Sequence, residues 1–212
     1  MRLAPEGWPF IGIAAAVLAG LAVLGLRGGP WWPAVAWLPI AMWVVAFFRD
    51  PQPSGPAGPE LVLAPADGRV IDIRSVEEPD FFKGPALRVS IFMNVFDCHV
   101  NRYPCDGTVA YRHYNPGRFL HAADEKASLD NEQSSVGLTT PHGKVMMRQI
   151  AGLIARRIVT DPAVGSPARQ AERFGMIRFG SRVDLFLPVG TRVTVKVGDR
   201  TRVARTVVAR WD

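Results

Sequence analysis

Residues 172–188 read ERFGMIRFGSRVDLFLP, and this stretch indicates the kind of fold that the chain forms. Two largely apolar runs, FGMI at 174–177 and VDLFL at 183–187, flank the tripeptide Phe-Gly-Ser at 179–181. Short runs rich in Ile, Val, Phe and Leu, divided by Gly, Ser or Pro, are typical of β-strands. The stretch is therefore predicted to form one strand, a Gly-Ser junction and a second strand.

Similar β-branched runs recur through most of the chain. They lie at residues 61–63, 69–73, 86–92, 107–111, 182–187, 191–197 and 201–208. This spacing, with Gly, Pro and Asp between the runs, indicates a mainly antiparallel sheet or barrel-like domain. Residues 144–158, KVMMRQIAGLIARRI, fit a strand that continues into a short helix near Arg156 and Arg157.

The N-terminal part of the chain has a different composition. Residues 8–26 and 31–48 form runs of 19 and 18 residues without a charged side chain. A helix that crosses the hydrocarbon core needs about 20 apolar residues, with a range of roughly 17 to 25. A hairpin buried in a soluble core would keep a polar face, and no small-x-small site suggests a cleaved signal peptide. Two membrane-embedded helices are expected, with Trp8, Trp31 and Trp32 as interfacial anchors.

A linker is predicted between these helices and the rest of the chain. Residues 50–59, DPQPSGPAGP, contain four prolines and two glycines, a composition typical of a semi-rigid spacer. The fold class is therefore mainly β (α+β). A membrane-anchoring helical hairpin at 1–49 and the linker at 50–59 precede an antiparallel β-rich domain at 60–212.

The charge balance suggests where this domain lies. The net charge is +6, and only four of the 25 basic residues are lysines. This excess fits a body held against an anionic membrane surface, although an Arg-rich genome would give the same balance. Two spans place both termini on one side, and the basic residues of 49–212 favour the cytoplasmic face of the inner cell membrane. No basic run is interleaved with aromatic residues, so nucleic-acid binding is not expected.

The Gly180-Ser181 dipeptide is the candidate reactive site. A serine after a glycine can attack the preceding carbonyl where the turn is strained and a base is near, because glycine leaves its carbonyl sterically open. The peptide becomes an ester, elimination leaves a dehydroalanine, and hydrolysis of the dehydroalanine releases ammonia and leaves a pyruvoyl group. The dipeptide alone is weak evidence, since Gly165-Ser166 is a second one in a Pro- and Ala-containing loop.

The setting of Gly180-Ser181 resembles the phosphatidylserine decarboxylase family in its short bacterial and archaeal form. Nearly the whole chain carries the resemblance. The matching segments are FFRDP at 47–51, APADG at 64–68, NVFDCHVNR at 94–102, PGRF at 116–119, KAS at 126–128, NE at 131–132, IAG at 150–152, ARRI at 155–158 and RFGMIRFGSRVDLFLP at 173–188.

The resemblance implies a self-cleaving proenzyme. The cut between Gly180 and Ser181 would give a large chain, 1–180, and a small chain, 181–212, which remain associated, and Ser181 would become the pyruvoyl group. An imine (Schiff base) between this group and the amine of phosphatidylserine would accept the electrons released with carbon dioxide, giving phosphatidylethanolamine. No metal and no pyridoxal phosphate would be needed. Archaetidylserine, which has the same head group, is an alternative substrate. Assembly of the protein into a homo-oligomer is also left open.

The resemblance also assigns roles to individual residues. Asp67 matches an aspartate that promotes self-cleavage, and His99 matches a histidine associated with decarboxylation. The long-form relatives carry a second histidine where this chain has Arg102, so the identity of the self-cleavage base stays open. Arg118, Arg156 and Arg157 are candidates for binding lipid phosphate through forked hydrogen bonds, and ordinary solvated arginines are the alternative.

Two other interpretations fit parts of the sequence less well. The residues Cys98, His99, Cys105, His113 and His121 contain no compact ligand pair, so no metal site is expected. The two cysteines suit a reducing compartment. The APADG turn followed by β-branched strands also fits a membrane-tethered lipoyl-type carrier. A carrier needs a lysine at a hairpin tip, and none of the four lysines has the surroundings of such a site.

Overall fold

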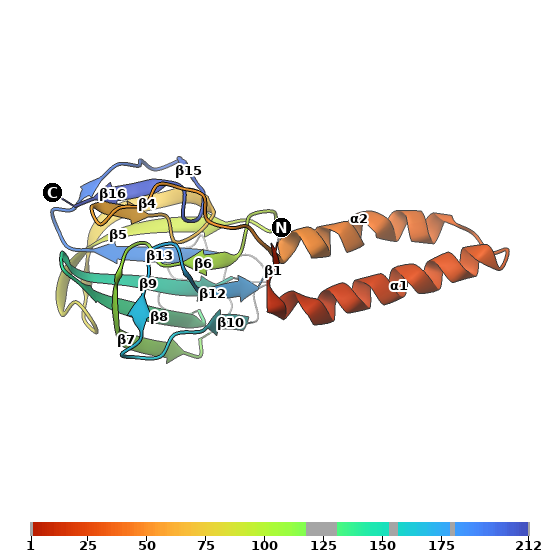
Figure 1. Cartoon of the computed structure of the whole chain (residues 1–212), viewed down its shortest axis with the longest axis horizontal. Coiled ribbons are helices and arrows are strands. Elements are labelled where there is room, and N and C mark those ends of the chain that lie inside the picture. The colour runs from red at the N-terminus through yellow and green to blue at the C-terminus, as the bar shows by residue number, and fades with distance from the viewer. Residues whose placement is uncertain (1, 118–130, 153–156, 179–180, 212) are drawn as a thin grey trace. The chain divides into compact units, whose positions relative to one another are not determined.

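The structure is a computed structural model that describes residues 2–117, 131–152, 157–178 and 181–211 (Figure 1). The chain divides into two compact units, Met1–Gln52 and Pro53–Asp212. Each unit has its own secondary structure, helical in the first and β in the second.

The first unit is a helical hairpin. A short 3-10 helix, η1 (Pro5–Gly7), leads into α1 (Trp8–Leu26), and α2 (Trp32–Phe47) returns after a turn in which Gly28 has a φ of +90°. The strands β1 (Arg2–Leu3) and β2 (Arg49–Asp50) pair antiparallel and close the base of the hairpin. Trp37 Nε1 donates to the carbonyl oxygen of Ala14 at 3.0 Å, which ties the two helices together.

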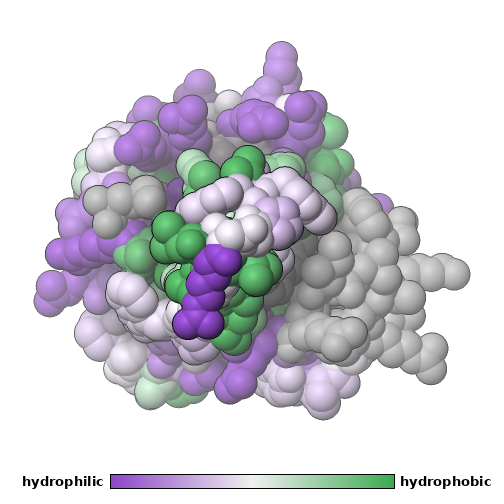
Figure 2. All heavy atoms as spheres, turned by 90° about the vertical axis from the view of Figure 1, so that its right-hand side faces the viewer, coloured by the Kyte–Doolittle hydropathy of each residue, from purple (hydrophilic) through white to green (hydrophobic). Residues whose placement is uncertain are grey.

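The outer surface of this hairpin is largely apolar. Figure 2 looks onto its tip, where pale and green residues predominate. Residues Pro5–Leu26 form one helical stretch of 22 residues that is long and apolar enough to cross a membrane. The second helix, α2, has only 16 residues. It is therefore shorter than the 18-residue uncharged run at 31–48. The long apolar helix is compatible with membrane association.

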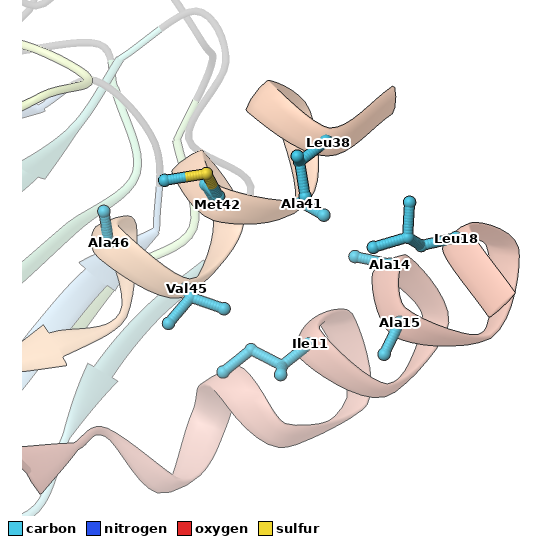
Figure 3. A pocket seen from close by; sticks show the side chains of 9 residues that line it. All are labelled: Ile11, Ala14, Ala15, Leu18, Leu38, Ala41, Met42, Val45 and Ala46. Carbon is cyan, nitrogen blue, oxygen red and sulfur yellow. The ribbon is translucent and has the colours of Figure 1, made fainter. Parts of the chain in front are cut away.

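Small side chains leave an apolar groove of about 470 Å³ between the two helices (Figure 3). Alanines from both helices lie along it, and larger aliphatic side chains surround them. The groove is lined by Ile11, Ala14, Ala15, Leu18, Leu38, Ala41, Met42, Val45 and Ala46. Its lining is apolar throughout, in keeping with the composition of the hairpin.

The second unit is built around an antiparallel sheet whose strand order is β11-β7-β8-β9-β13-β5-β4-β15 (Figure 1). The strands are β4 (Gly68–Glu78), β5 (Gly84–Met93), β7 (Gly107–Asn115), β8 (Gln133–Thr140), β9 (Gly143–Ala151), β11 (Pro167–Ala168), β13 (Ser181–Leu187) and β15 (Arg200–Thr201). All of the paired strands run antiparallel.

Two three-stranded sheets accompany the large one. The first has the order β10-β12-β6 and the second β14-β16-β3. Their strands are β10 (Arg157–Thr160), β12 (Arg173–Arg178), β6 (Val100–Arg102), β14 (Arg192–Val193), β16 (Val207–Arg210) and β3 (Leu61–Leu63). Buried residues from all three sheets form one hydrophobic core.

Strand β13 lies in the middle of the large sheet and is buried along its whole length. Val183, Leu185 and Leu187 point into the main core, because alternate residues of a strand face the same side. Arg182 and Asp184 lie on the other face, where their side chains form two hydrogen bonds of 2.7 Å. This buried, bidentate ion pair allows two charged residues to occupy a central strand.

The predicted fold class is confirmed, and the structure differs from three local predictions. Residues 157 and 158 are not helical, because β10 pairs with β12 from Arg157↔Arg178 to Thr160↔Gly175. The rest of that expected helix, 153–156, lies outside the described residues. Two predicted C-terminal strands are also mostly turn or irregular structure.

The turns at 194–206 have local causes. Asp199 Oδ2 accepts from the Lys196 amide at 3.0 Å and closes one turn. Ala204 has a φ of +53°, which no extended strand allows. The predicted strands at 191–197 and 201–208 are therefore reduced to β14, the second residue of β15, and the first two residues of β16.

Candidate active site

Ser181 is the first residue of the central strand β13. Its cross-strand neighbours are Met93 on β5 and Ala151 on β9. The residue is fully buried, and its hydroxyl oxygen has no hydrogen-bond partner among the residues that the structure describes. Buried hydroxyl groups normally form hydrogen bonds, so a buried hydroxyl without one needs an explanation. A hydroxyl in this position adds no hydrogen bond to the fold, so Ser181 is a candidate for a role other than a structural one.

The neighbour Ala151 is itself held from a third segment. Asn131 Nδ2 donates to the Ala151 carbonyl oxygen at 2.6 Å, and the Ala151 amide donates to the Glu132 carbonyl oxygen at 2.9 Å. Glu132 Oε1 in turn accepts from the Tyr114 hydroxyl at 2.9 Å. The Asn-Glu pair of the sequence therefore borders the strand that lies beside Ser181.

His99 lies just before β6 and close to the strand that precedes the Gly-Ser junction. Its carbonyl oxygen accepts from the Ile177 amide of β12 at 3.2 Å. The imidazole is fully buried, and its Nδ1 lies 3.0 Å from the Asp97 carbonyl oxygen. Since a carbonyl oxygen only accepts, Nδ1 carries the proton of this bond, and Nε2 carries the lone pair in the neutral ring.

A tight turn joins Met93 to His99. The Asn94 amide donates to Asp97 Oδ2 at 2.9 Å, and the Asp97 amide donates back to the Asn94 carbonyl oxygen at 3.0 Å. Asn94 Oδ1 also accepts from the Phe96 amide at 2.8 Å. Asn and Asp favour such turns because their short side chains bond to nearby backbone. The turn connects the end of β5, where Met93 lies opposite Ser181, to His99.

Asp67 connects three segments of the site. Its Oδ2 accepts from the Cys98 amide at 3.3 Å, and its Oδ1 accepts from the Val203 amide at 2.7 Å. Gly68, the next residue, has a φ of +152°, and a Cβ there would collide with the Phe92 carbonyl oxygen. Asp67 therefore links Cys98, which precedes His99, to the C-terminal segment. Cys98 is 31 positions from Asp67 in the sequence, and Val203 is 136 positions from it.

The contacts of Arg102 indicate a structural role and not that of a base. Arg102 Nη1 donates to the Ala171 carbonyl oxygen at 2.9 Å, and its amide donates to Pro65 at 3.1 Å. An arginine side chain keeps its proton in proteins. Arg102 therefore supports the loop before β12 and does not replace the second histidine of the long forms.

The remaining candidates lie elsewhere or outside the described residues. Arg157 is exposed on β10, opposite Arg178. Gly180, Arg118, Arg156 and His121 fall outside the ranges that the structure describes. Within those ranges, no three His, Cys, Asp or Glu side chains are grouped so that they could hold a metal ion.

Cys105 is a buried thiol in the main core. Burial is the main cause that raises its pKa to about 12, and the nearby Asp106 carboxylate adds to the effect. The thiolate is the nucleophilic form of cysteine. Cys105 is therefore a packing residue at neutral pH.

Sequence reasoning missed a buried polar network next to Ser181. Its members are Asn101, Gln149, Thr160 and Ser134, each from a different strand. One signal was present in the sequence: Asn101 stands two positions after His99 in a short β run. The other members are far apart in the sequence, so only the strand register brings them together.

These observations define an antiparallel β protein that has a buried serine at the start of its central strand and a buried histidine beside the preceding strand. Comparison with known sequences specifies the class further. The sequence model of the phosphatidylserine decarboxylase family matches residues 40–209. The chain belongs to this family, and the resemblance found in the sequence is confirmed.

Individual relatives match almost end to end. A protein of Symbiobacterium thermophilum named phosphatidylserine decarboxylase proenzyme is 48% identical over 209 residues, which cover 98% of this chain and 95% of the relative. A protein of Burkholderia cenocepacia with the same name is 45% identical over 211 residues, covering 99% and 96%. The corresponding protein of Burkholderia vietnamiensis is also 45% identical over 211 residues.

Proposed function

We propose that this chain is a proenzyme that cuts itself between Gly180 and Ser181 and then converts phosphatidylserine to phosphatidylethanolamine and carbon dioxide. The names of the relatives support the reaction and the proenzyme state. The observation that carries the assignment to Ser181 is its fully buried hydroxyl, without a hydrogen-bond partner in the described chain, at the start of the central strand. The group made from Ser181 would be a pyruvoyl group.

The fold explains how a cut chain would stay together. After cleavage, residues 181–212 would be held by non-covalent contacts alone. Strand β13 pairs with β5 on one side and β9 on the other, β15 pairs with β4, and β16 pairs with β3. Two ladders on one strand, together with the Asp67 bond to Val203, would retain the small chain.

His99 is proposed to hold and deliver a proton during decarboxylation. The pyruvoyl group would supply an electron-withdrawing carbonyl, and the carbon that loses carbon dioxide then needs a proton. An imidazole with a pKa near neutrality can carry this proton at working pH. The bond from Nδ1 to Asp97 fixes the ring and assigns the exchange to Nε2.

Asp67 is proposed to act earlier, in self-cleavage. Both of its carboxylate oxygens accept backbone hydrogen bonds, one of them from the residue that precedes His99. This arrangement supports a positioning role, in which Asp67 sets the backbone around the junction.

The apolar hairpin would keep the enzyme at the membrane that contains its substrate. Its exposed apolar side chains and the 22-residue helical stretch support membrane association. The basic residues of 49–212 favour the cytoplasmic side for the β unit. Arg157, together with Arg118 and Arg156, is the candidate for binding the lipid phosphate. An archaetidylserine decarboxylase would have the same site, because the two lipids share the serine head group.

The proposal predicts that Ser181→Ala leaves one uncut, inactive chain of about the calculated 23.2 kDa. Alanine has no hydroxyl to attack the preceding carbonyl, so neither the cut nor the prosthetic group can form. Denaturing electrophoresis and intact mass spectrometry measure both, with Ser166→Ala, a change at the other Gly-Ser pair, as the matched control. Active wild-type protein that consists of a single chain with an ordinary serine would refute the assignment.

A further inference from the structure

Four hydrogen-bonded polar side chains, three of them buried and Thr160 half-buried, lie near Ser181. The proposed reaction does not use them. Ser134 lies on β8, Gln149 on β9, Thr160 on β10 and Asn101 on β6. Asn101 and Gln149 are fully buried. Burial of amide groups in an apolar core costs free energy unless every polar atom is bonded.

The hydrogen bonds of the network have a defined direction. The Thr160 hydroxyl donates to Gln149 Oε1 at 2.9 Å and lies 2.7 Å from the Ser134 hydroxyl. Gln149 Nε2 then donates to Asn101 Oδ1 at 2.8 Å. Because the Asn101 oxygen is the acceptor in this bond, the amide nitrogen is left as a donor with two hydrogens. The network thus fixes which end of the Asn101 amide faces the rest of the site.

The Asn101 donor has only long contacts among the described residues. Nδ2 lies 3.5 Å from the Pro65 carbonyl oxygen and 3.8 Å from Met93 Sδ. The first distance is beyond the range of a strong N–H···O bond, and a thioether sulfur is a weak acceptor. Met93 is also the cross-strand neighbour of Ser181, whose hydroxyl lacks a partner in the described chain. An underused donor and an unpartnered hydroxyl therefore both adjoin Met93.

We propose that Asn101 donates a hydrogen bond to the oxygen of residue 181, and that Gln149 is the positioning residue that holds the amide in its donor orientation. This inference rests on the proposed function and adds a catalytic residue to it. The structure shows Ser181 Oγ without this bond, so in the uncut chain the bond forms as the site rearranges for cleavage. The hydrogen of Oγ is then directed away from Asn101 toward a base. In the mature protein the acceptor is the keto oxygen, and the donor withdraws electron density from the carbonyl carbon that an amine attacks.

The test uses the full-length chain in detergent and two variants of Asn101. Asn101→Leu has a similar size but no donor, and Asn101→Asp keeps an oxygen for Gln149 while an oxygen replaces the amide nitrogen. The first readout is the rate of self-cleavage per folded molecule, followed on denaturing gels, with the folded fraction taken from circular dichroism. The second is the rate at which converted protein reacts with phenylhydrazine, a small carbonyl probe. Loss of one such donor should slow both rates by about 10²-fold.

Thr140→Val is the matched control, because it also removes a hydrogen-bonding group from a buried polar residue of the β unit, away from the site. Thr140 Oγ1 donates to the Gly143 carbonyl oxygen at 2.7 Å in the β8–β9 hairpin. This variant should lose stability and keep both rates. Asn101 variants with wild-type rates, or a Thr140→Val protein that is slowed equally, would overturn the proposal. Wild-type protein that never cleaves would instead refute the proposed function itself.

Discussion

At the scale of the residue, His99 and Asp67 are connected by the hydrogen bond from the Cys98 amide to the Asp67 carboxylate. Their side chains differ in what they bind. The imidazole of His99 bonds to the carbonyl oxygen of Asp97, two residues before it. The carboxylate of Asp67 bonds to backbone amides from two distant segments. The first arrangement fixes a tautomer, and the second fixes the course of the chain. Different effects of mutation are expected.

His99→Ala should still give two chains and the prosthetic group but lose decarboxylation activity. Without the imidazole, no positioned group delivers the proton, and a general acid typically contributes about 10²-fold or more to a rate. Electrophoresis would report cleavage, and release of carbon dioxide would report activity. His113→Ala, a change at an exposed histidine on β7, is the control. A His99→Ala chain that fails to cleave at all would show that His99 also serves self-processing, in keeping with Arg102 at the place of the second histidine.

Asp67→Ala should accumulate uncut proenzyme. The variant loses the acceptor for the amides of Cys98 and Val203, so the backbone next to His99 is no longer attached to the C-terminal segment. The fraction of uncut chain at fixed times after synthesis measures the effect. Asp106→Ala, which removes an exposed carboxylate that accepts from the Gln170 amide at 2.6 Å, provides the comparison. Normal cleavage in Asp67→Ala would remove this residue from the self-processing step.

At the scale of the element, the site depends on how closely β12 packs between its neighbours. Gly175 lies in this strand, opposite Thr160 on β10 and Asn101 on β6. A Cβ at Gly175 would collide with the Val159 carbonyl oxygen and lie 3.1 Å from Gln149 Nε2. The absence of a side chain is therefore a condition for the three-stranded sheet.

Gly175→Ala should destabilise the β unit by about 1–3 kcal/mol, because a methyl group forced into a packed region displaces backbone. Thermal unfolding followed by circular dichroism measures the loss. Gly84→Ala is the control at the start of β5, where an added Cβ would meet nothing within 4 Å. A surface change of this kind usually stays within about 0.5 kcal/mol. Equal unfolding temperatures for the two variants would contradict the packing argument.

At the scale of the whole molecule, the chain combines an apolar hairpin with a β unit that has its own core. The core of the β unit is formed by its own three sheets, so the unit has the means to fold without the hairpin. The hairpin has exposed apolar residues on both helices, which water solvates poorly. The two units are therefore expected to differ in where they partition.

Deletion of residues 2–52 should release the β unit into the soluble fraction while sparing self-cleavage. The hairpin carries the apolar surface that inserts into lipid, and every described residue of the candidate site belongs to the second unit. Flotation with liposomes in high salt measures membrane binding, because salt screens attraction between basic residues and anionic lipid. The full-length chain is the positive control. A truncated protein that still floats would place the main anchor in the β unit.

The sequence by itself determined the features that depend on local composition and pattern. The uncharged runs predicted the hairpin, the β-branched runs predicted the strands around Ser181, and the motif residues identified the family. Each of these signals is contained in a short window, where periodicity and turn chemistry are sufficient. The helix predicted at 157–158 was wrong because the pairing of β10 with β12 outweighs local preference.

Only the tertiary structure decided which distant residues meet. The register of β13 with β5 and β9 places Met93 and Ala151 beside Ser181. The same register buries Gln149 where it bonds Asn101, 48 positions away. Strand pairing is set by the burial of whole faces, and a slip of one residue would send each of these side chains to the opposite side. The contacts of the site therefore follow from the packing of all three sheets and cannot be seen in any single segment.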